Sequence, residues 1–286
     1  MKFNKLFVLG AGTMGNGIAQ VGLQAGMTVV VGDSYAPALE RAKTYFENAL
    51  SKNVAKGRMT EEQKADCLSR LTITGDLNAA AAADVVIEAI KEDLDVKKAV
   101  FAQLSEICSE DAILCSNTSS ISISAMSAAV KNPGRFLGTH FFNPVPAMKL
   151  LEIVKGISTT PETIEAVKEM GAEWGKVCIV AKDSSGFIAN RIGSPMLNAA
   201  VNVLDEGIGT AEDIDAAMKY GWGFPMGPLE LLDMVGLDVQ VALMEVFYQE
   251  YGDPYYKPAP LMKRMVAAGQ LGRKSGKGFY DYTDKK

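Results

Sequence analysis

The sequence lacks the features that mark membrane-spanning, exported and metal-binding chains. No stretch reaches the 18 consecutive apolar residues that a transmembrane helix needs. Residues 1–9 could begin a signal peptide, but they lead into a glycine-rich turn and no cleavage-site pattern follows. Four cysteines without CxxC spacing favour buried thiols in a reducing compartment over disulfides or metal ligands; they are Cys67, Cys108, Cys115 and Cys178. We therefore expect a cytoplasmic protein with no membrane partner and no bound metal.

Histidine and excess positive charge are also scarce. The net charge is −5, which argues against a nucleic-acid partner, and His140 is the only histidine in the chain. The remaining composition is that of a globular protein, with 48% hydrophobic and 22% charged residues. A length of 286 residues favours one large domain followed or preceded by one small domain.

Short apolar runs alternate with amphipathic stretches through about the first 180 residues. The runs are KLFVLG, TVVVGD, DVVIEAI and AILCSN, and later LGTHFF, LLEIV and KVCIV. This alternation predicts an α/β fold with a mainly parallel sheet covered by helices. Between residues 36 and 70 the pattern predicts an inserted arm of two helices, the second of which begins at a capping box from Thr60 to Gln63.

The pattern becomes purely helical after the polar stretch 182–186. We therefore expect an α/β domain of residues 1–184 and an all-α domain of residues 185–286. In the second domain we predict a long helix over 187–206 and a helix from Thr210 to Gly221. A further helix is predicted in PMGPLELLDMVG, which has proline near its start.

A glycine-rich sequence directly after the first strand predicts a nucleotide site. Its residues are Gly10, Ala11, Gly12, Thr13, Met14 and Gly15, and a helix is expected after them. Missing side chains there permit a tight turn, close approach of a pyrophosphate and close helix packing. Asp33 follows the second strand about 20 residues later, where a carboxylate accepts hydrogen bonds from ribose and repels a 2′-phosphate. A merely structural glycine turn is the alternative, but it explains neither the context nor the spacing. We predict NAD(H) as the cofactor in preference to NADP(H).

His140 and Glu152 form a candidate acid–base pair. His140 ends the run LGTHFF, and histidine is the side chain best suited to proton transfer near neutral pH. If the two runs pair as an antiparallel hairpin centred on Pro146, Glu152 lies directly opposite His140. The alternatives are an imidazole satisfied within the core and a solvated glutamate, although a charge inside LLEIV is unusual.

Three further groups of polar residues are weaker candidates. Residues 116–120, SNTSS, follow a buried strand at the ligand-binding edge of the expected sheet, but such residues also cap helices. Asn190 and Arg191 interrupt an otherwise largely apolar helix. Lys52 and Lys56 lie four residues apart on the helical arm, where they could meet a phosphate or form an ordinary solvated face.

Taken together, these segments resemble the short bacterial 3-hydroxyacyl-CoA dehydrogenases over essentially the whole chain. The resemblance rests on GAGTMG (10–15), IEAIKED (87–93), SNTSS (116–120), GTHFFNPVPAMKLLEIV (138–154), GFIANRI (186–192), FPMGPLELLD (224–233) and GRKSGKGFYDY (272–282). It implies a Rossmann-like NAD-binding domain followed by a helical domain that forms a homodimer. Trp222 is a bulky residue where related sequences vary, which leaves the length of the acyl chain open.

The resemblance also implies a role for individual residues. His140 would be the catalytic base, Glu152 its partner, and Ser119 and Asn190 the groups around the substrate oxygen. Lys52 and Lys56 would meet coenzyme A. The residues implied to line the nucleotide or the active site are Glu92, Lys97, Asn117, Asn143 and Lys274.

The reaction implied is hydride transfer at C3 between NAD and a short (S)-3-hydroxyacyl-CoA, most simply (S)-3-hydroxybutyryl-CoA and its product acetoacetyl-CoA. Two alternatives stay open from the sequence. One is a sugar-acid dehydrogenase on the same scaffold, such as an L-gulonate dehydrogenase. The other is a non-catalytic NAD-binding or crystallin-like protein, against which the presence of both His140 and Glu152 argues.

Overall fold

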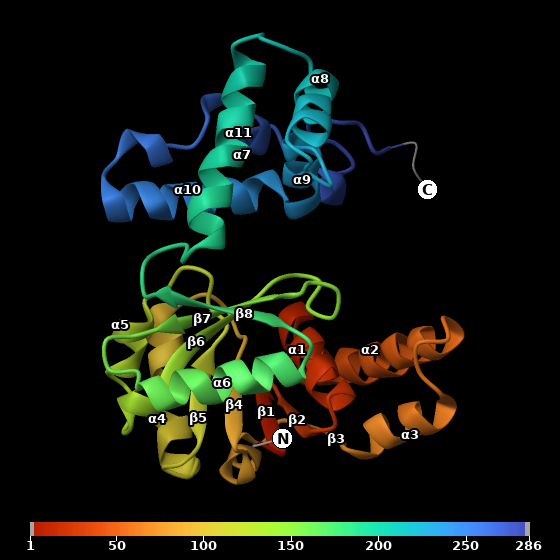
Figure 1. Cartoon of the computed structure of the whole chain (residues 1–286), viewed down its shortest axis with the longest axis vertical. Helices are drawn as coiled ribbons and strands as arrows, with labels where there is room; N and C mark the ends of the chain where they lie inside the picture. Colours follow the sequence, from red (N-terminus) through yellow and green to blue (C-terminus); the bar gives the residue numbers. More distant parts are fainter. Residues whose placement is uncertain (1–2, 284–286) are drawn as a thin grey trace. The chain divides into compact units, whose positions relative to one another are not determined.

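Residues 3–283 are described by a computed structural model of the chain, in which two structural units meet between Ser184 and Ser185. The first unit carries the strands, and the described part of the second contains helices and two isolated bridges. The expected α/β fold followed by a helical domain is confirmed (Figure 1).

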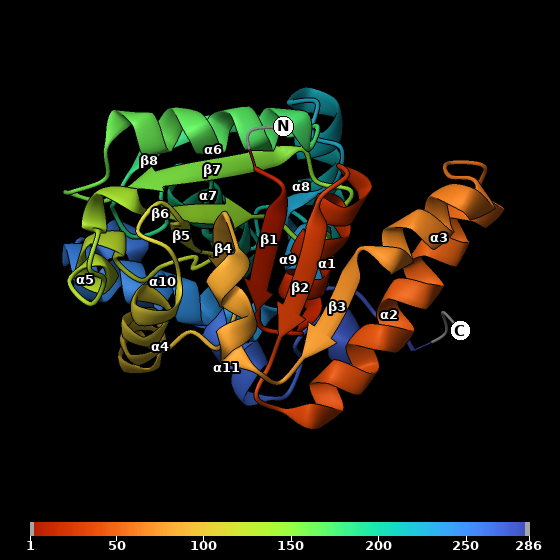
Figure 2. The ribbon, with the colours of Figure 1, turned by 90° about the horizontal axis from the view of Figure 1, so that it is seen from below.

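A single eight-stranded sheet with the order β3-β2-β1-β4-β5-β6-β7-β8 forms the first unit (Figure 2). Its strands are β1 (Lys5–Leu9), β2 (Thr28–Gly32), β3 (Leu71–Thr74), β4 (Val85–Glu88), β5 (Ile113–Ser116), β6 (Phe136–Phe141), β7 (Leu150–Lys155) and β8 (Val177–Lys182). All neighbouring strands are parallel except β6 and β7, which run antiparallel. The prediction of a mainly parallel sheet was therefore right.

β3 is the strand that the sequence did not reveal. It is four residues long and lies at the edge of the sheet, where Thr72 is exposed and the other three residues are half-buried. It therefore lacks the continuous apolar run by which the buried strands were recognised.

Helices cover both faces of this sheet. They are α1 (Thr13–Gln24), α2 (Ala36–Ala55), α3 (Glu61–Ser69), α4 (Leu94–Ile107), α5 (Ile123–Ser127) and α6 (Pro161–Glu173), with two short 3-10 helices at Leu77–Ala82 and Pro133–Arg135. Because side chains alternate along a strand, Leu6 and Val8 of β1 share one core with residues of α1, α2 and α6. On the opposite face Phe101 of α4 packs edge-on against Phe136 of β6, with ring centroids 4.7 Å apart.

The predicted helical arm is present beside the β3 edge (Figure 2). α2 ends before Gly57, whose positive φ of 64° suits a residue without a side chain, and α3 begins at the predicted capping box. The Thr60 side chain accepts from the Gln63 backbone N–H while the Gln63 side chain accepts from the Thr60 backbone N–H. Local signals were sufficient for this segment.

Helices account for the regular structure of the second unit. They are α7 (Ala189–Asp205), α8 (Ala211–Ala216), α9 (Pro228–Val235), α10 (Leu237–Tyr251) and α11 (Pro260–Ala267), with a π-helical turn at Ala217–Gly221 and 3-10 helices at Pro254–Tyr256 and Arg273–Ser275. Thr210 caps α8 by accepting from the Asp213 backbone N–H, as predicted. The predicted helix 187–206 is slightly shorter, because Phe187 takes a positive φ of 50° that is incompatible with the helix.

The cysteines are less uniformly buried than expected. Cys67 and Cys115 are buried, whereas Cys108 and Cys178 are half-buried; all four are free thiols. Loss of hydration raises the pKa of each thiol, to about 11 at Cys108. Within residues 3–283 every helix is too short or too polar to cross a bilayer.

Candidate functional site

The glycine-rich turn joins β1 to α1 with little room for side chains. Gly10 has a positive φ of 111°, and a Cβ there would lie 2.5 Å from the carbonyl oxygen of Ala89. A Cβ on Gly15 would lie 1.8 Å from the carbonyl oxygen of Gly10. α1 begins at Thr13 and not after Gly15 as expected, so this close approach occurs within its first turn. By contrast, a Cβ on Gly12 would meet no atom within 4 Å.

Asp33 is held at this turn by two backbone donors. Its Oδ2 accepts from the Ala11 N–H and its Oδ1 from the Tyr35 N–H, both at 2.8 Å. Each oxygen keeps a lone-pair direction for another donor. The carboxylate therefore fixes the turn and also presents negative charge to the cavity that it lines.

A cavity of 570 Å³ opens at the carboxyl ends of β1, β2 and β4. Gly12 and Asp33 line one part of it, and the apolar side chains of Ile90, Val96 and Val100 line another. Open space at Gly12 suits a phosphate, the Asp33 carboxylate suits ribose hydroxyls, and the apolar wall suits a base. The residues present thus fit an adenine nucleotide.

The β6–β7 hairpin brings His140 and Glu152 together as the sequence predicted. They are directly opposite in the antiparallel register, and His140 Nδ1 lies 2.7 Å from Glu152 Oε2. The glutamate is fully buried and the histidine is 4% exposed. A buried carboxylate needs strong hydrogen-bond donors, so this contact limits rotation of the imidazole.

Ser119 meets the other side of the imidazole. Its Oγ lies 3.1 Å from His140 Nε2. The alternative that residues 116–120 only cap a helix does not account for this contact, because a different serine caps α5: Ser122 accepts from the Ala125 N–H. Thr118 shapes the turn by accepting from the N–H groups of Ser120 and Ile121.

The other candidates of the first unit lie around this loop. Glu92 Oε1 accepts from the Ser119 N–H at 3.1 Å, and also from the Thr118 hydroxyl. Asn117 Oδ1 accepts from the Phe141 N–H at 3.0 Å, which ties the ends of β5 and β6. Asn143 is exposed on the loop that follows β6, next to a cis bond to Pro144.

Lys97 is buried more deeply than a ligand-lining residue needs to be. Its side chain is 1% exposed, and its Nζ lies 2.5 Å from Glu88 Oε1 and 3.3 Å from Glu92 Oε2. Glu88 was not among the residues that the sequence singled out. A signal was available, because a charged residue ends the otherwise apolar run VVIE.

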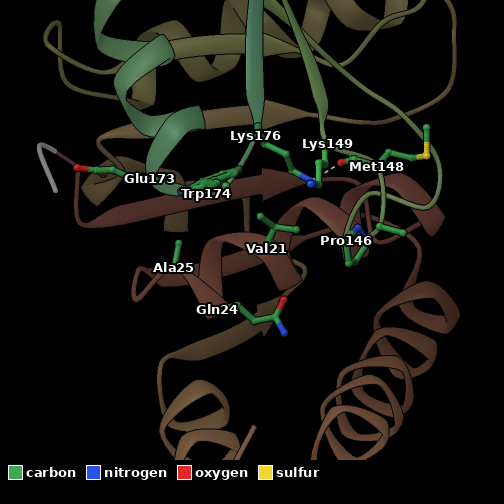
Figure 3. A pocket seen from close by; sticks show the side chains of 11 residues that line it. Val21, Gln24, Ala25, Pro146, Met148, Lys149, Glu173, Trp174 and Lys176 are labelled. Atoms are coloured by element: carbon green, nitrogen blue, oxygen red, sulfur yellow. Dashed lines mark hydrogen bonds between the residues drawn. The ribbon is translucent and has the colours of Figure 1, made fainter. Parts of the chain in front are cut away.

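Lys176 is a second residue that the sequence did not single out. It is 9% exposed, and its Nζ donates to the carbonyl oxygen of Val145 at 2.5 Å. The same Nζ donates to the carbonyl oxygen of Met148 at 2.8 Å (Figure 3). Burial lowers the pKa of its ammonium group. The lysine thereby secures the loop between the strands of His140 and Glu152, at the wall of a 410 Å³ cavity that Pro146 and Trp174 also line.

Four candidates lie away from this cluster or in the other unit. Lys52 and Lys56 are exposed at the end of the arm, with Lys52 in the last turn of α2 and Lys56 directly after it. In the second unit, Asn190 lies in the first turn of α7, and Lys274 Nζ lies 2.5 Å from Asp238 Oδ1.

Comparison with family models covers nearly the whole chain. The model described as 3-hydroxyacyl-CoA dehydrogenase, NAD binding domain, matches residues 5–184. The model described as 3-hydroxyacyl-CoA dehydrogenase, C-terminal domain, matches residues 186–282.

Curated proteins and solved structures agree with this match. A probable 3-hydroxybutyryl-CoA dehydrogenase of Deinococcus radiodurans is 46% identical over 99% of this chain and 100% of its own. A 3-hydroxybutyryl-CoA dehydrogenase of Bradyrhizobium diazoefficiens is also 46% identical, over 99% and 96% of the two chains. The crystal structure of (S)-3-hydroxybutyryl-CoA dehydrogenase from Ralstonia eutropha superposes with a TM-score of 0.95 at 44% identity, covering 99% of this chain and 100% of that one.

The two glycines of the turn allow a matched test of the nucleotide site. Gly12→Ala places a methyl group in open space, so its melting temperature should stay within about 2 °C of the unmodified protein. The same methyl group would obstruct a pyrophosphate, so the Kd for NADH should rise by at least about tenfold in a fluorescence titration. Gly15→Ala should instead lower the melting temperature by about 5 °C or more, because its Cβ overlaps the backbone at Gly10. Normal NADH binding by Gly12→Ala would contradict this placement of the pyrophosphate.

Proposed function

The chain belongs to the 3-hydroxyacyl-CoA dehydrogenase family, and we propose that it interconverts (S)-3-hydroxybutyryl-CoA and acetoacetyl-CoA with NAD. The observation that carries this proposal is the contact of one imidazole with Ser119 on one side and Glu152 on the other. β1 and β6 run in the same direction in one sheet. This array therefore lies at the carboxyl ends of the strands, as does the glycine turn. The names of the relatives support the substrate.

His140 is proposed as the acid–base group of this reaction. An aliphatic hydroxyl is a very weak acid, so its oxidation needs a base within hydrogen-bond reach. Ser119 Oγ lies 3.1 Å from His140 Nε2, so a substrate oxygen that approaches the hydroxyl would also approach the imidazole. Glu152 orients the ring through its contact with Nδ1 and so directs Nε2 toward Ser119. NAD, when bound, accepts or returns the hydride.

The cofactor and substrate contacts are proposed for the residues named from the family resemblance. Asp33 would accept from the adenosine ribose and disfavour the 2′-phosphate of NADP by charge repulsion. The nicotinamide end of the site would be lined by Glu92, Asn117 and Asn143. Lys97 would support this end through its contact with Glu92. From the second unit Asn190 would meet the substrate oxygen and Lys274 the nucleotide.

We also propose that the second unit mediates a homodimer. α7, α8 and the turn after α8 border an apolar groove of 580 Å³, lined among others by Met196, Val203, Ile208 and Trp222. Ile208 and Trp222 are 69% and 77% exposed. Large exposed apolar side chains around one groove indicate a surface that is covered in the assembled protein.

Absorbance at 340 nm tests the proposed activity directly. With acetoacetyl-CoA as substrate, the enzyme should consume NADH, and NADPH should be used with a kcat/KM lower by about tenfold or more because of Asp33. L-gulonate with NAD+ serves as the control substrate for the sugar-acid alternative. Inactivity with acetoacetyl-CoA would overturn the proposed function, and faster turnover of NADPH would overturn the role of Asp33.

Substitutions at His140 and Glu152 should show that the two residues act as one unit. His140→Asn should lower kcat by roughly 10²–10⁴-fold, the usual contribution of a positioned acid–base group, with little change in NADH affinity. Glu152→Gln should also lower kcat, because a neutral amide is a weaker acceptor for the Nδ1 proton and holds the imidazole less firmly. The double variant should lose much less than the product of the single losses. Multiplicative losses would show that the residues act independently.

The two lysines of the arm should affect binding and not turnover. Lys52→Ala/Lys56→Ala should raise KM for acetoacetyl-CoA roughly three- to tenfold at low salt and weaken its salt dependence, while kcat stays unchanged. Lys131→Ala/Lys168→Ala is the matched control, because it removes the same charge from lysines that pair with Glu106 and Glu165 elsewhere on the unit. Equal effects of both double variants would leave Lys52 and Lys56 as ordinary solvated residues.

A further inference from the structure

Glu88 carries a buried charge just outside the set of residues that the family resemblance implies. It is the last residue of β4 and is fully buried in the centre of the sheet. From its contacts we infer that Glu88 is a positioning residue. It holds the loop 117–120 through two sets of contacts and thereby fixes the position of Ser119 relative to His140. The kinetic consequences of this inference rest on the function proposed above, whereas its geometric consequences do not.

Both oxygens of Glu88 are engaged. Oε1 accepts from the Ile90 N–H at 2.7 Å and from Lys97 Nζ at 2.5 Å. Oε2 accepts from the Ser116 hydroxyl at 2.7 Å. The carboxylate therefore connects the end of β4, the buried face of α4 and the end of β5.

The first set of contacts links Glu88 to the loop through Lys97 and Glu92. Lys97 bridges the two carboxylates, with Glu88 at 2.5 Å and Glu92 at 3.3 Å. Glu92 turns its Oε2 to the lysine and its Oε1 to the N–H of Ser119. Loss of the Glu88 charge would leave the ammonium with Glu92 alone, and the attraction would draw Glu92 away from the Ser119 backbone.

The second set of contacts links Glu88 to the end of β5, from which the loop begins. Ser116 donates to Glu88, and the next residue, Asn117, donates its N–H to the Glu88 carbonyl oxygen at 2.7 Å. Asn117 in turn accepts from the Phe141 N–H, next to His140 on β6. Glu88 therefore fixes the start of the loop 117–120 from β5, in addition to its link to Ser119 through Lys97 and Glu92.

Stability alone does not explain a charge at this position. A buried ion pair can be replaced by apolar side chains of similar size with little loss of stability, whereas removal of one partner is strongly destabilising. What an apolar pair cannot supply is the cation that orients Glu92. Replacing the pair by apolar side chains should therefore disturb the site while leaving stability nearly unchanged, whereas a purely structural role would change both together.

The single histidine provides a readout that needs neither substrate nor cofactor. In untagged protein labelled with ¹⁵N, the imidazole resonances belong to His140 alone. Glu88→Gln keeps the size of the side chain but removes its charge, and it should shift these resonances relative to the unmodified protein. Asp84→Asn is the matched control, since Asp84 precedes the same strand and holds the N–H groups of Asn4 and Lys5 at its other end.

A second variant covers the possibility that Glu88→Gln fails to fold. Glu88→Leu/Lys97→Met removes the pair as a whole and should keep a melting temperature within a few degrees of the unmodified protein. Its imidazole resonances should still be shifted, and its kcat with acetoacetyl-CoA and NADH should be at least about tenfold lower. Native resonances and native kcat in this folded variant would overturn the inference.

A double-variant cycle with Ser119 tests the route of the effect. If Glu88 acts through Ser119, Glu88→Gln combined with Ser119→Ala should lose little more kcat than Ser119→Ala alone. If the unmodified enzyme is active and the losses of kcat from Glu88→Gln and Ser119→Ala multiply, Glu88 does not act through Ser119 and the inference is overturned. Inactivity of the unmodified enzyme would instead reject the proposed function, while the shift of the imidazole resonances would still decide whether Glu88 positions the site.

Discussion

A glutamate without solvent access lies in β7, and the arrangement of the site depends on how its charge is satisfied. Glu152 is directly opposite His140 because β7 reverses the direction of the sheet at this point. Parallel neighbours would require a crossover of about a dozen residues or more between these strands. The eight-residue connection 142–149 instead makes the two side chains cross-strand partners, and Lys176 secures that connection by two hydrogen bonds. The reversal thus fixes Nδ1 against Glu152 and leaves Nε2 facing Ser119.

The parts of the structure that were predictable are those encoded over a few residues. The capping box at Thr60, the strand–turn–helix context of the glycine motif and the symmetry of the hairpin about Pro146 each depend on near neighbours in sequence. Even so, α1 begins at Thr13 and not after Gly15, and the close approach of Gly15 to Gly10 lies inside its first turn. β3 was missed since an edge strand of half-buried residues carries little hydrophobic signal.

The parts that were not predictable depend on contacts between elements. SNTSS was compatible with helix capping or with a site. In the structure Ser122, outside this segment, caps α5, and Ser119 contacts His140. A lysine in an amphipathic stretch is ordinarily solvated, and nothing local to Lys97 indicates that its ammonium lies between two carboxylates. Placing that ammonium requires knowing that α4 packs against the end of β4. The sequence shows a glutamate at the end of a buried strand but not its partner.

Ser119 and His140 belong to different elements, and each has its own direct contact with a carboxylate. Glu152 restrains the imidazole from β7, whereas Glu92 holds the backbone of Ser119 from the loop before α4. If only the histidine were restrained, the serine hydroxyl could still move with its loop, and the 3.1 Å contact between Oγ and Nε2 would lose its definition. Glu152 is fully buried, and Glu92, which is partly exposed, contacts the buried Lys97, so the two groups have separate supports. A site that must hold a substrate oxygen between a hydroxyl and an imidazole requires the distance between them to be set before the substrate arrives.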